Sequence, residues 1–271
     1  DVVGHGTIVA QIAAGRGIGS WGGGVAPGAT IVSSRIINDT RPDDDGTGEG
    51  NEIRAGQGYG DFFRSINGQL AGAGARIINN SWGGLYWNDA ALTTELASAY
   101  RDFVIGRGGL IVFANGNAGD IPALRANPSD NAALPSLSAA AADLERGWLT
   151  VAALDPDNPL RLTDYSQACG IAMNYCLAAP GNVVFVDPDA RTGDASYDLY
   201  RGGGTSYAAP QVSGAAAVVW SAFPYFDNDL VRQTLLGTAR DLGAPGVDPE
   251  FGWGLLDVSR AANGPGNFSW G

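Results

Sequence analysis

The stretch that decides both the fold and the chemistry is Gly202-Gly-Gly-Thr-Ser-Tyr-Ala-Ala-Pro-Gln-Val-Ser-Gly214, which runs directly into the apolar segment 215–220. Three glycines free the backbone, and Thr205 is a candidate N-cap whose hydroxyl can accept from the first turn. Ser206 then lies in that first turn, where the helix dipole stabilises developing negative charge. The Ala/Val-rich continuation beyond Pro210 predicts a helix buried on both sides. A reactive serine needs this setting, although the string alone fits a glycine turn that merely starts a helix equally well.

The composition indicates one acidic globular domain. The chain has 271 residues, of which 45% are hydrophobic and 16% charged, and its net charge is −12. This length suits one large α/β domain. A strongly acidic surface disfavours nucleic acid and anionic membranes as partners. No apolar run reaches the length of a membrane span, so we expect no membrane contact by this domain.

Short apolar runs alternate with helical patterns along the chain. The predicted strands are 29–37, 75–80, 110–114, 148–154 and 182–186. The predicted helices are 4–14, 51–70, 89–105 and 227–236, besides the helix that carries Ser206. This order predicts a parallel sheet with right-handed crossovers.

Polar segments follow two of these strands. In parallel sheets the functional residues gather where the strands end. Ser81-Trp82-Gly83 follows the strand 75–80, and Asn115-Gly116-Asn117 follows the strand 110–114. We therefore expect the two segments to lie near each other.

His5 is the only histidine and lies at the start of the first predicted helix. Thr7 is a candidate cap of that helix, and Gly15 a candidate stop. The flanking glycines Gly4 and Gly6 let another group approach the imidazole closely. A lone histidine is often structural or incidental, yet a general base that titrates near neutrality has to come from His5 or from a perturbed group.

Several chemistries are disfavoured by the motifs. The glycine clusters lack the lysine of a phosphate-binding loop, because the chain contains no lysine. The segment 204–208 ends in alanine where the Gly-x-Ser-x-Gly elbow requires glycine. No segment singles out a pair of carboxylates. Nucleophilic acyl transfer remains, with the Ser206 hydroxyl, the His5 imidazole and the Asn117 amide as its three components.

Cys169 and Cys176 are the only cysteines. Their short spacing permits a disulfide, and two free buried thiols are the alternative. With His5 far away in sequence, the pair makes a poor zinc site. An oxidised pair would indicate an extracytoplasmic location.

Five motifs, in this order, resemble the subtilisin-like serine proteases. They are Gly4-His-Gly-Thr-Ile-Val-Ala10, Gly24-Val-Ala-Pro-Gly-Ala-Thr-Ile31, Asn80-Ser-Trp-Gly83, Phe113-Ala-Asn-Gly-Asn-Ala-Gly119 and Gly204-Thr-Ser-Tyr-Ala-Ala-Pro210. The resemblance implies a three-layer α/β fold, with a mostly parallel central sheet flanked by helices. It also implies a serine endopeptidase that acts on proteins or peptides.

The resemblance implies a role for each site residue. His5 would be the general base and Ser206 the nucleophile, while the Asn117 side-chain amide and the Ser206 N–H would form the oxyanion hole. One wall of the substrate cleft would be Ser81, Trp82 and Gly83, whose backbone pairs with an extended peptide. Ala114 and Gly116 would line the opposite side. Asn115, by contrast, is expected to be a turn residue of little consequence.

The sequence departs from the family pattern in one respect. The family's catalytic residues follow the order Asp, His, Ser, whereas here only four residues precede His5, and Asp1 is too near in sequence to orient its imidazole. We therefore expect the catalytic Asp and its strand to lie upstream of this chain, leaving 1–262 as a catalytic domain without that strand and 263–271 as an exit linker. Without the Asp, activity should be weak. A binding or adhesion module that has lost catalysis, and a non-protease acyl hydrolase, are the alternatives.

A finer resemblance is to the protease passengers of bacterial autotransporters. It rests on the segment from Cys169 to Cys176, on the following Leu177-Ala-Ala-Pro-Gly181, and on the ending Gly252-Trp-Gly-Leu-Leu-Asp257. It implies a secreted or cell-surface location. Structural calcium is common in the wider family, and acidic stretches occur at 43–45 and 155–157, but spacing alone assembles no ligand set. We therefore assign no metal and no cofactor, and leave peptide specificity and oligomeric state open.

Overall fold

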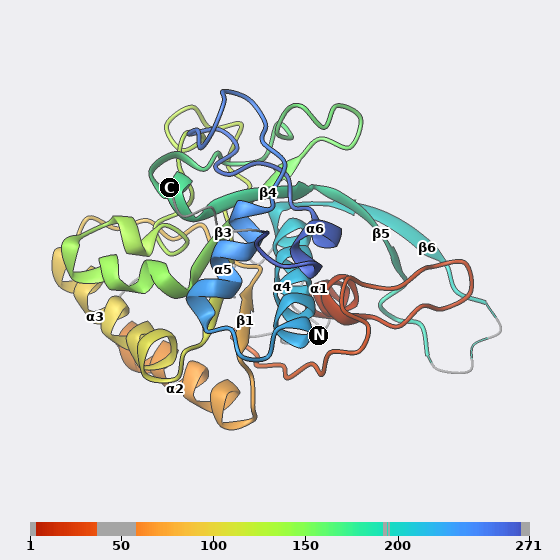
Figure 1. The fold of residues 1–271 in the computed structure, drawn as a ribbon, viewed down its shortest axis with the longest axis horizontal. Coiled ribbons are helices and arrows are strands. Elements are labelled where there is room, and N and C mark those ends of the chain that lie inside the picture. The colour runs from red at the N-terminus through yellow and green to blue at the C-terminus, as the bar shows by residue number, and fades with distance from the viewer. Residues whose placement is uncertain (1–3, 37–57, 192–193, 195, 267–271) are drawn as a thin grey trace, which may run out of the picture.

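The computed structural model describes residues 4–36, 58–191, 194 and 196–266. At its centre is a four-stranded sheet, parallel throughout, in the order β1-β2-β3-β4. The strands are Ile77–Asn80, Leu110–Ala114, Trp148–Leu154 and Cys176–Pro180. Helices cover both faces (Figure 1). The predicted three-layer α/β fold with a parallel central sheet is confirmed.

Alternating side chains of the buried strand β2 supply both cores. Leu110, Val112 and Ala114 pack in the cluster formed with α4 (Thr205–Ala222). Ile111 and Phe113 point the other way, into the cluster formed with α2 (Tyr59–Gly72) and α3 (Ala90–Arg101). A strand buried on both faces gives the continuous apolar run seen in the sequence.

The parallel register brings the strand ends together. Asn80 at the end of β1 is paired with Phe113 near the end of β2. The segments that follow, Ser81–Gly83 and Asn115–Asn117, therefore leave the sheet from the same edge, as the sequence predicts.

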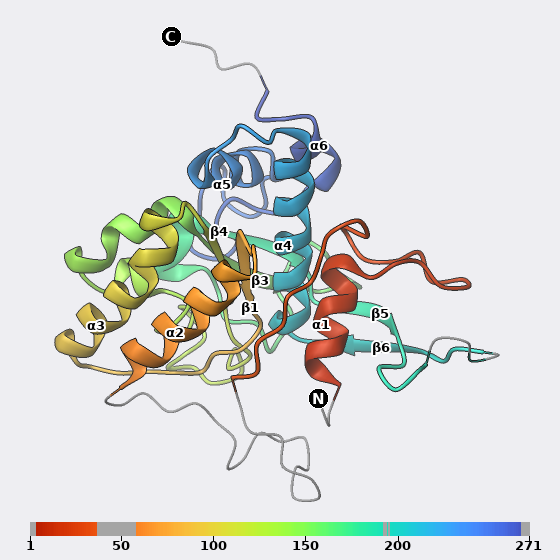
Figure 2. The ribbon, with the colours of Figure 1, turned by 90° about the horizontal axis from the view of Figure 1, so that it is seen from below.

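Helix α1 (His5–Ala14) lies against α4, and Figure 2 shows the two side by side. A glycine permits this close approach: a Cβ at Gly214 would lie 2.7 Å from both the Ala13 carbonyl oxygen and the Val25 Cβ. The contact fixes the helix that begins with His5 against the helix that carries Ser206.

The remaining regular elements surround this core. They are β5 (Asn182–Val186) and β6 (Leu199–Gly203), which form an antiparallel ribbon, the helices α5 (Asn228–Gly237) and α6 (Val258–Ala262), a π-helical turn at Asp102–Gly106, and 3₁₀ turns at Leu134–Ser136, Ala139–Gly147 and Gly170–Tyr175.

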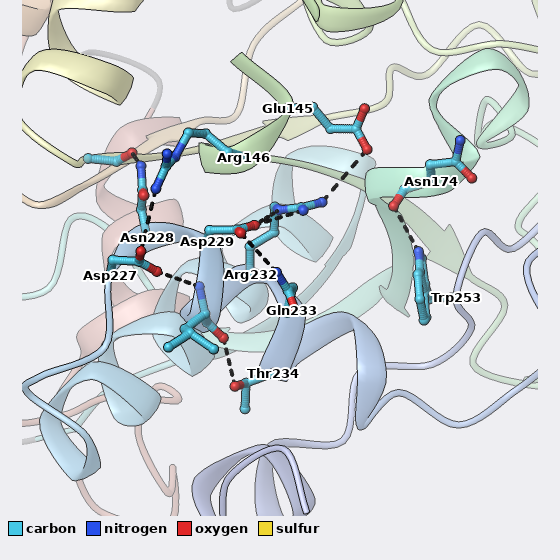
Figure 3. A network of polar contacts seen from close by, with 12 residues as sticks. Glu145, Arg146, Asn174, Asp227, Asn228, Asp229, Arg232, Gln233, Thr234 and Trp253 are labelled. Atoms are coloured by element: carbon cyan, nitrogen blue, oxygen red, sulfur yellow. Dashed lines mark hydrogen bonds and ion pairs between the residues drawn. The ribbon is translucent and has the colours of Figure 1, made fainter. Parts of the chain in front are cut away.

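Polar contacts attach α5 to the body (Figure 3). The buried Asn228 amide donates to the carbonyl oxygens of Val104 (2.9 Å) and Gly109 (2.8 Å). Arg232 pairs with Asp229 at 2.9 Å, and its other terminal nitrogen lies 3.9 Å from Glu145. The Asn228 amide thus satisfies two backbone carbonyls that packing alone would leave unpaired.

Some local predictions were wrong. Residues 29–36 form no strand, and Ile31 and Val32 are 49% and 38% exposed. A β-branched run becomes a strand only when it pairs with another strand, and no strand pairing in the described part of the chain includes these residues. The last strand residue, 37, and the predicted loop 38–50 lie outside the described residues, as does the start of the predicted helix 51–70. The strands β4 and β6 were not predicted.

Both predicted threonine caps were also wrong. The N-caps are Gly4 for α1 and Gly204 for α4, and neither helix has a side-chain cap. Thr7 lies within the first turn of α1. The Thr205 hydroxyl is directed at Asn117 instead of at its own helix. Gly15 does end α1.

Cys169 and Cys176 form a disulfide with their Cα atoms 5.7 Å apart, which confirms the pairing and leaves no thiol for zinc. Replacing both with serine should lower the free energy of unfolding by about 2 kcal/mol, because the loop is short. For a domain of this size, the melting temperature should fall by about 4–8 °C. Calorimetry checks this. Reductant should lower the melting temperature of the parent by the same amount and leave that of the variant unchanged. Equal melting temperatures for the oxidised parent and the variant would contradict this prediction.

Candidate active site

Ser206 and Ser81 form a reciprocal pair of hydrogen bonds. The Ser206 hydroxyl donates to the Ser81 carbonyl oxygen at 3.1 Å, and the Ser81 hydroxyl donates to the Ser206 carbonyl oxygen at 2.7 Å. The pair links the end of β1 to the first turn of α4. The structure thus places the predicted nucleophile directly beside one predicted cleft wall.

Two further residues extend this pair into the protein. The Asn79 amide donates to the Ser81 hydroxyl at 2.8 Å, and the Ser213 hydroxyl donates to Asn79 Oδ1 at 2.8 Å. The sequence analysis missed both. The available signal was that Ser213 follows Ser206 by two helical turns and so shares its face of α4.

The Asn117 amide is oriented by Thr205. Its Oδ1 accepts from the Thr205 N–H at 2.9 Å and from the Thr205 hydroxyl at 2.7 Å. Because both donors need the oxygen, the amide nitrogen points away from them.

Two nitrogen atoms that can donate hydrogen bonds lie near one point beside Gly204. A Cβ added at Gly204 would lie 3.7 Å from both Asn117 Nδ2 and the Ser206 nitrogen. Gly204 itself has φ 155° and ψ 152°, a conformation that glycine adopts far more easily than other residues. Two donors around an open position next to a hydroxyl are suited to stabilising an oxyanion.

Gln167 supports the loop that carries Asn117, and the sequence analysis missed it. This buried side chain accepts from the Ala118 N–H at 3.3 Å and donates to the Asn127 carbonyl oxygen at 2.8 Å. A Cβ at Gly116 would overlap Gln167 Oε1, so Gly116 allows the close approach.

The expectation for Asn115 was wrong. Asn115 is fully buried, and its amide donates to the Gln167 carbonyl oxygen at 3.1 Å. Removing a buried, hydrogen-bonded amide leaves its partners without a hydrogen bond. Asn115 is therefore structural, and its replacement is unsuitable as a control that leaves the protein unchanged.

The predicted walls differ in what they expose. The Trp82 ring stacks on Phe63 with 5.2 Å between centroids, and its Nε1 donates to Asn80 Oδ1, so the side chain faces the α2/α3 core. Gly83 packs on Ser129. On the opposite side Ala114 is buried at the end of β2. What Ser81–Gly83 can offer an extended peptide is therefore chiefly backbone.

His5 lies at the start of α1, next to the nucleophile's helix. Its ring is 5.8 Å from the ring of Tyr207, the residue after Ser206. Partial burial lowers the pKa of the imidazole below 6.5, by disfavouring the charged form. Among the described residues no carboxylate pairs with His5, and the Ser206 hydroxyl is bonded to Ser81 instead of to His5. The predicted base therefore lies against the residue that follows the predicted nucleophile, without a hydrogen bond between His5 and Ser206 in the described structure.

Replacing Asn117 with alanine tests its predicted role as an oxyanion donor. The kcat for hydrolysis of a peptide should fall about 10²–10³-fold with little change in KM, because a donor to the oxyanion acts only in the transition state. That magnitude was measured for subtilisin. Steady-state kinetics on a peptide substrate check it. The matched control is Asn174→Ala, since Asn174 is exposed and its bond with the Trp253 indole uses its backbone carbonyl and not its side chain. Equal losses in both variants would contradict the role of Asn117.

In the part of the chain that the structure describes, no three His, Cys, Asp or Glu side chains are placed to hold a metal ion. The acidic stretch 43–45 lies outside that part. Nor do the described helices include one with the length and apolarity that a bilayer crossing demands.

Comparison with known proteins identifies the family. The family model described as "Subtilase family" matches residues 1–254. Over 317 residues the chain is 30% identical to the autotransporter lipoprotein NalP of Neisseria meningitidis serogroup B, covering 99% of this chain and 26% of NalP. It is also 30% identical over 307 residues to an extracellular serine protease of Serratia marcescens, covering 97% and 28%. The chain thus spans about a quarter of the length of these relatives.

Solved structures show the same fold. Fervidolysin from Fervidobacterium pennivorans, a keratinolytic enzyme related to subtilisin, aligns with a TM-score of 0.69 and 27% identity over 96% of this chain and 36% of that one. A mutant of the protease domain of PatA aligns with a TM-score of 0.64 and 26% identity, covering 96% and 79%.

Proposed function

Because the chain belongs to the subtilase family, we propose that it is the peptidase portion of a secreted or surface-exposed serine endopeptidase. The observation that carries the proposal is that the Ser206 nitrogen and the Asn117 amide nitrogen both lie beside Gly204, the N-cap of α4. The first turn of this helix also carries Tyr207, whose ring contacts His5. Catalysis of acyl transfer needs this combination of hydroxyl, imidazole and oxyanion donors.

The reaction follows from these positions. The Ser206 hydroxyl leaves the Ser81 carbonyl and turns toward neutral His5, which takes its proton as the Oγ attacks the scissile carbonyl carbon. The resulting oxyanion accepts from the Ser206 N–H and Asn117 Nδ2. His5 then donates its proton to the departing amine, and water attacks the acyl-enzyme by the reverse sequence.

Substrate binding is coupled to this step. In the proposed cleft an extended peptide pairs with the backbone of Ser81–Gly83, with Ala114 and Gly116 on its other side. The Ser81 carbonyl oxygen now occupied by the Ser206 hydroxyl is an acceptor for a substrate N–H. A peptide that takes this acceptor displaces the hydroxyl, which frees it to turn toward His5.

The orienting carboxylate is the missing component. A triad needs a carboxylate to hold the imidazole and stabilise its protonated form. Since none of the described residues supplies it, we propose that it comes from residues outside the described set. Until it is in place, the pKa of His5 is governed by burial alone.

The proposed location rests on two observations. The relatives include proteins named as an autotransporter lipoprotein and an extracellular serine protease. The chain also carries a disulfide, which is typical of oxidising compartments.

The proposal is tested by incubating the full-length protein with internally quenched peptides and with matched acyl esters. We expect cleavage of internal peptide bonds. Hydrolysis of esters alone would favour a non-protease acyl hydrolase.

A second candidate is a binding or adhesion module. It is favoured by the Ser206 hydroxyl, which is hydrogen bonded to the Ser81 carbonyl and not to His5, and by the lack of a described carboxylate at His5. Saturable peptide binding with no turnover would support this module over the endopeptidase.

A further inference from the structure

Tyr207 is the side chain whose ring contacts His5. The two ring centroids are 5.8 Å apart, with 32° between the planes. Tyr207 also contacts Phe185 of β5 at 6.0 Å, and both rings pack with Ile8 and Ile12 of α1. Tyr207 therefore connects the proposed base, the proposed nucleophile's helix and the ribbon.

The surrounding backbone confines the rings of Tyr207 and Phe185. A Cβ at Gly202 would lie 3.2 Å from Tyr207 Cε2 and 2.9 Å from Phe185 Cε1, so the ribbon backbone closes off one side of Tyr207. Gly4, immediately before His5, has φ 76°, and a Cβ there would lie 2.6 Å from Pro188 Cγ. The start of α1 and the ring of Tyr207 are thus both held by the ribbon and its connection.

The imidazole has few other constraints. In the described part of the chain it makes no ion pair or hydrogen bond, whereas Tyr207 packs against it. Aromatic pairs at such separations are favourable by an amount that shifts a rotamer equilibrium on the order of tenfold.

We propose that Tyr207 is a positioning residue that holds the His5 imidazole beside Ser206, an inference that rests on the proposed endopeptidase function. Tyr207 acts through packing and not through its hydroxyl, and the proposed reaction gives its side chain no contact with the reacting atoms.

The elements packed around this contact carry few charged groups. Asp187 and Asp189 flank Pro188, Arg201 lies on β6, and Arg16 follows the far end of α1 from His5; none forms an ion pair with His5 in the described structure. Burial raises the pKa of the Tyr207 hydroxyl, so this group stays neutral in the acid range. Burial lowers the pKa of His5, and the ring of Tyr207 lies against the imidazole.

The test combines kinetics with an NMR titration of His5 in the full-length protein, its signal identified by its loss in His5→Gln. Tyr207→Phe should keep kcat within about twofold of the parent. Tyr207→Leu and Tyr207→Met should lower kcat about tenfold with KM nearly unchanged. In both of these variants, the acid limb of the pH–rate profile and the His5 pKa should move up toward 6.5. Two variants are used so that misfolding of one leaves the test intact.

Phe185→Leu is the matched control, because Phe185 contacts Tyr207 and, unlike it, not His5. It should lower the melting temperature and leave the acid limb in place. An unchanged His5 pKa and kcat in folded Tyr207→Leu would overturn the inference, as would an equal kcat loss in Tyr207→Phe. A protein without peptidase activity whose His5 signal still shifts in Tyr207→Leu would support the contact and reject the endopeptidase function.

Discussion

Replacing Ser206 with alanine is expected to lower kcat for peptide hydrolysis about 10⁶-fold, the scale measured for the corresponding change in subtilisin. No neighbouring hydroxyl can substitute. The Thr205 hydroxyl is buried and donates to Asn117 at 2.7 Å, and the Ser81 hydroxyl donates to the Ser206 carbonyl at 2.7 Å. KM should change little, because the hydroxyl contributes to the reaction and not to peptide binding.

The control is Ser98→Ala, which removes an exposed hydroxyl on α3 that only accepts from Arg64 at 3.3 Å. It should retain full activity. Ser206→Ala itself loses one hydrogen bond, to the Ser81 carbonyl, so its free energy of unfolding should differ from the parent's by about 1 kcal/mol. Folded Ser206→Ala with a tenth of the parent's activity would rule out this residue as the nucleophile.

Replacing His5 with alanine should lower kcat by a similar factor, about 10⁶, because serine and histidine act as one unit. The Ser206→Ala, His5→Ala double variant should therefore be no slower than either single variant. Steady-state kinetics on all three check this. Losses that multiply in the double variant would show that the two residues act independently.

His5 also sets a pH dependence. Only the neutral imidazole accepts a proton, so kcat/KM should fall with acidity through the pKa of His5, which burial places below 6.5 in the described environment. A carboxylate supplied beside the ring would raise that pKa again.

Stability depends on the same group. The unfolded chain binds the proton with an ordinary pKa near 6.5, whereas the folded protein binds it less readily. The contribution of His5 to stability is therefore fully present above pH 6.5 and falls as the pH drops from there through the folded pKa. Denaturant titrations across this pH range should show the free energy of unfolding of the parent falling more steeply with acidity than that of His5→Gln. Parallel curves would contradict a lowered pKa.

The sequence predicts those features that local patterns encode. The glycine turn before a buried Ala/Val-rich helix places Ser206 in the first turn of α4, and the apolar runs locate β2 and β3. The order of strands and helices is enough to bring Ser81 and Asn117 to one edge of a parallel sheet, because such strands end on the same side.

The remaining features depend on contacts between distant segments. The segment 29–36 has the β-branched composition of a strand, but it forms none in the described structure, because a strand also needs a neighbouring strand that the local sequence does not specify. Asn115 and Gln167 are polar and lie in loops, yet both are buried. Each side chain forms a hydrogen bond with a backbone group of the loop that carries the other residue. The contact of Tyr207 with His5 joins residues 202 positions apart, which no local pattern reports.

The most direct measurement is labelling of the full-length protein with a fluorophosphonate, which reacts with a serine only where a base and oxyanion donors activate it. Mass spectrometry should locate one adduct per molecule on Ser206, reduced strongly in Asn117→Ala and absent from Ser206→Ala and His5→Ala. A folded protein that remains unlabelled, or that carries the adduct on another serine, would contradict the active site assembled at the start of α4.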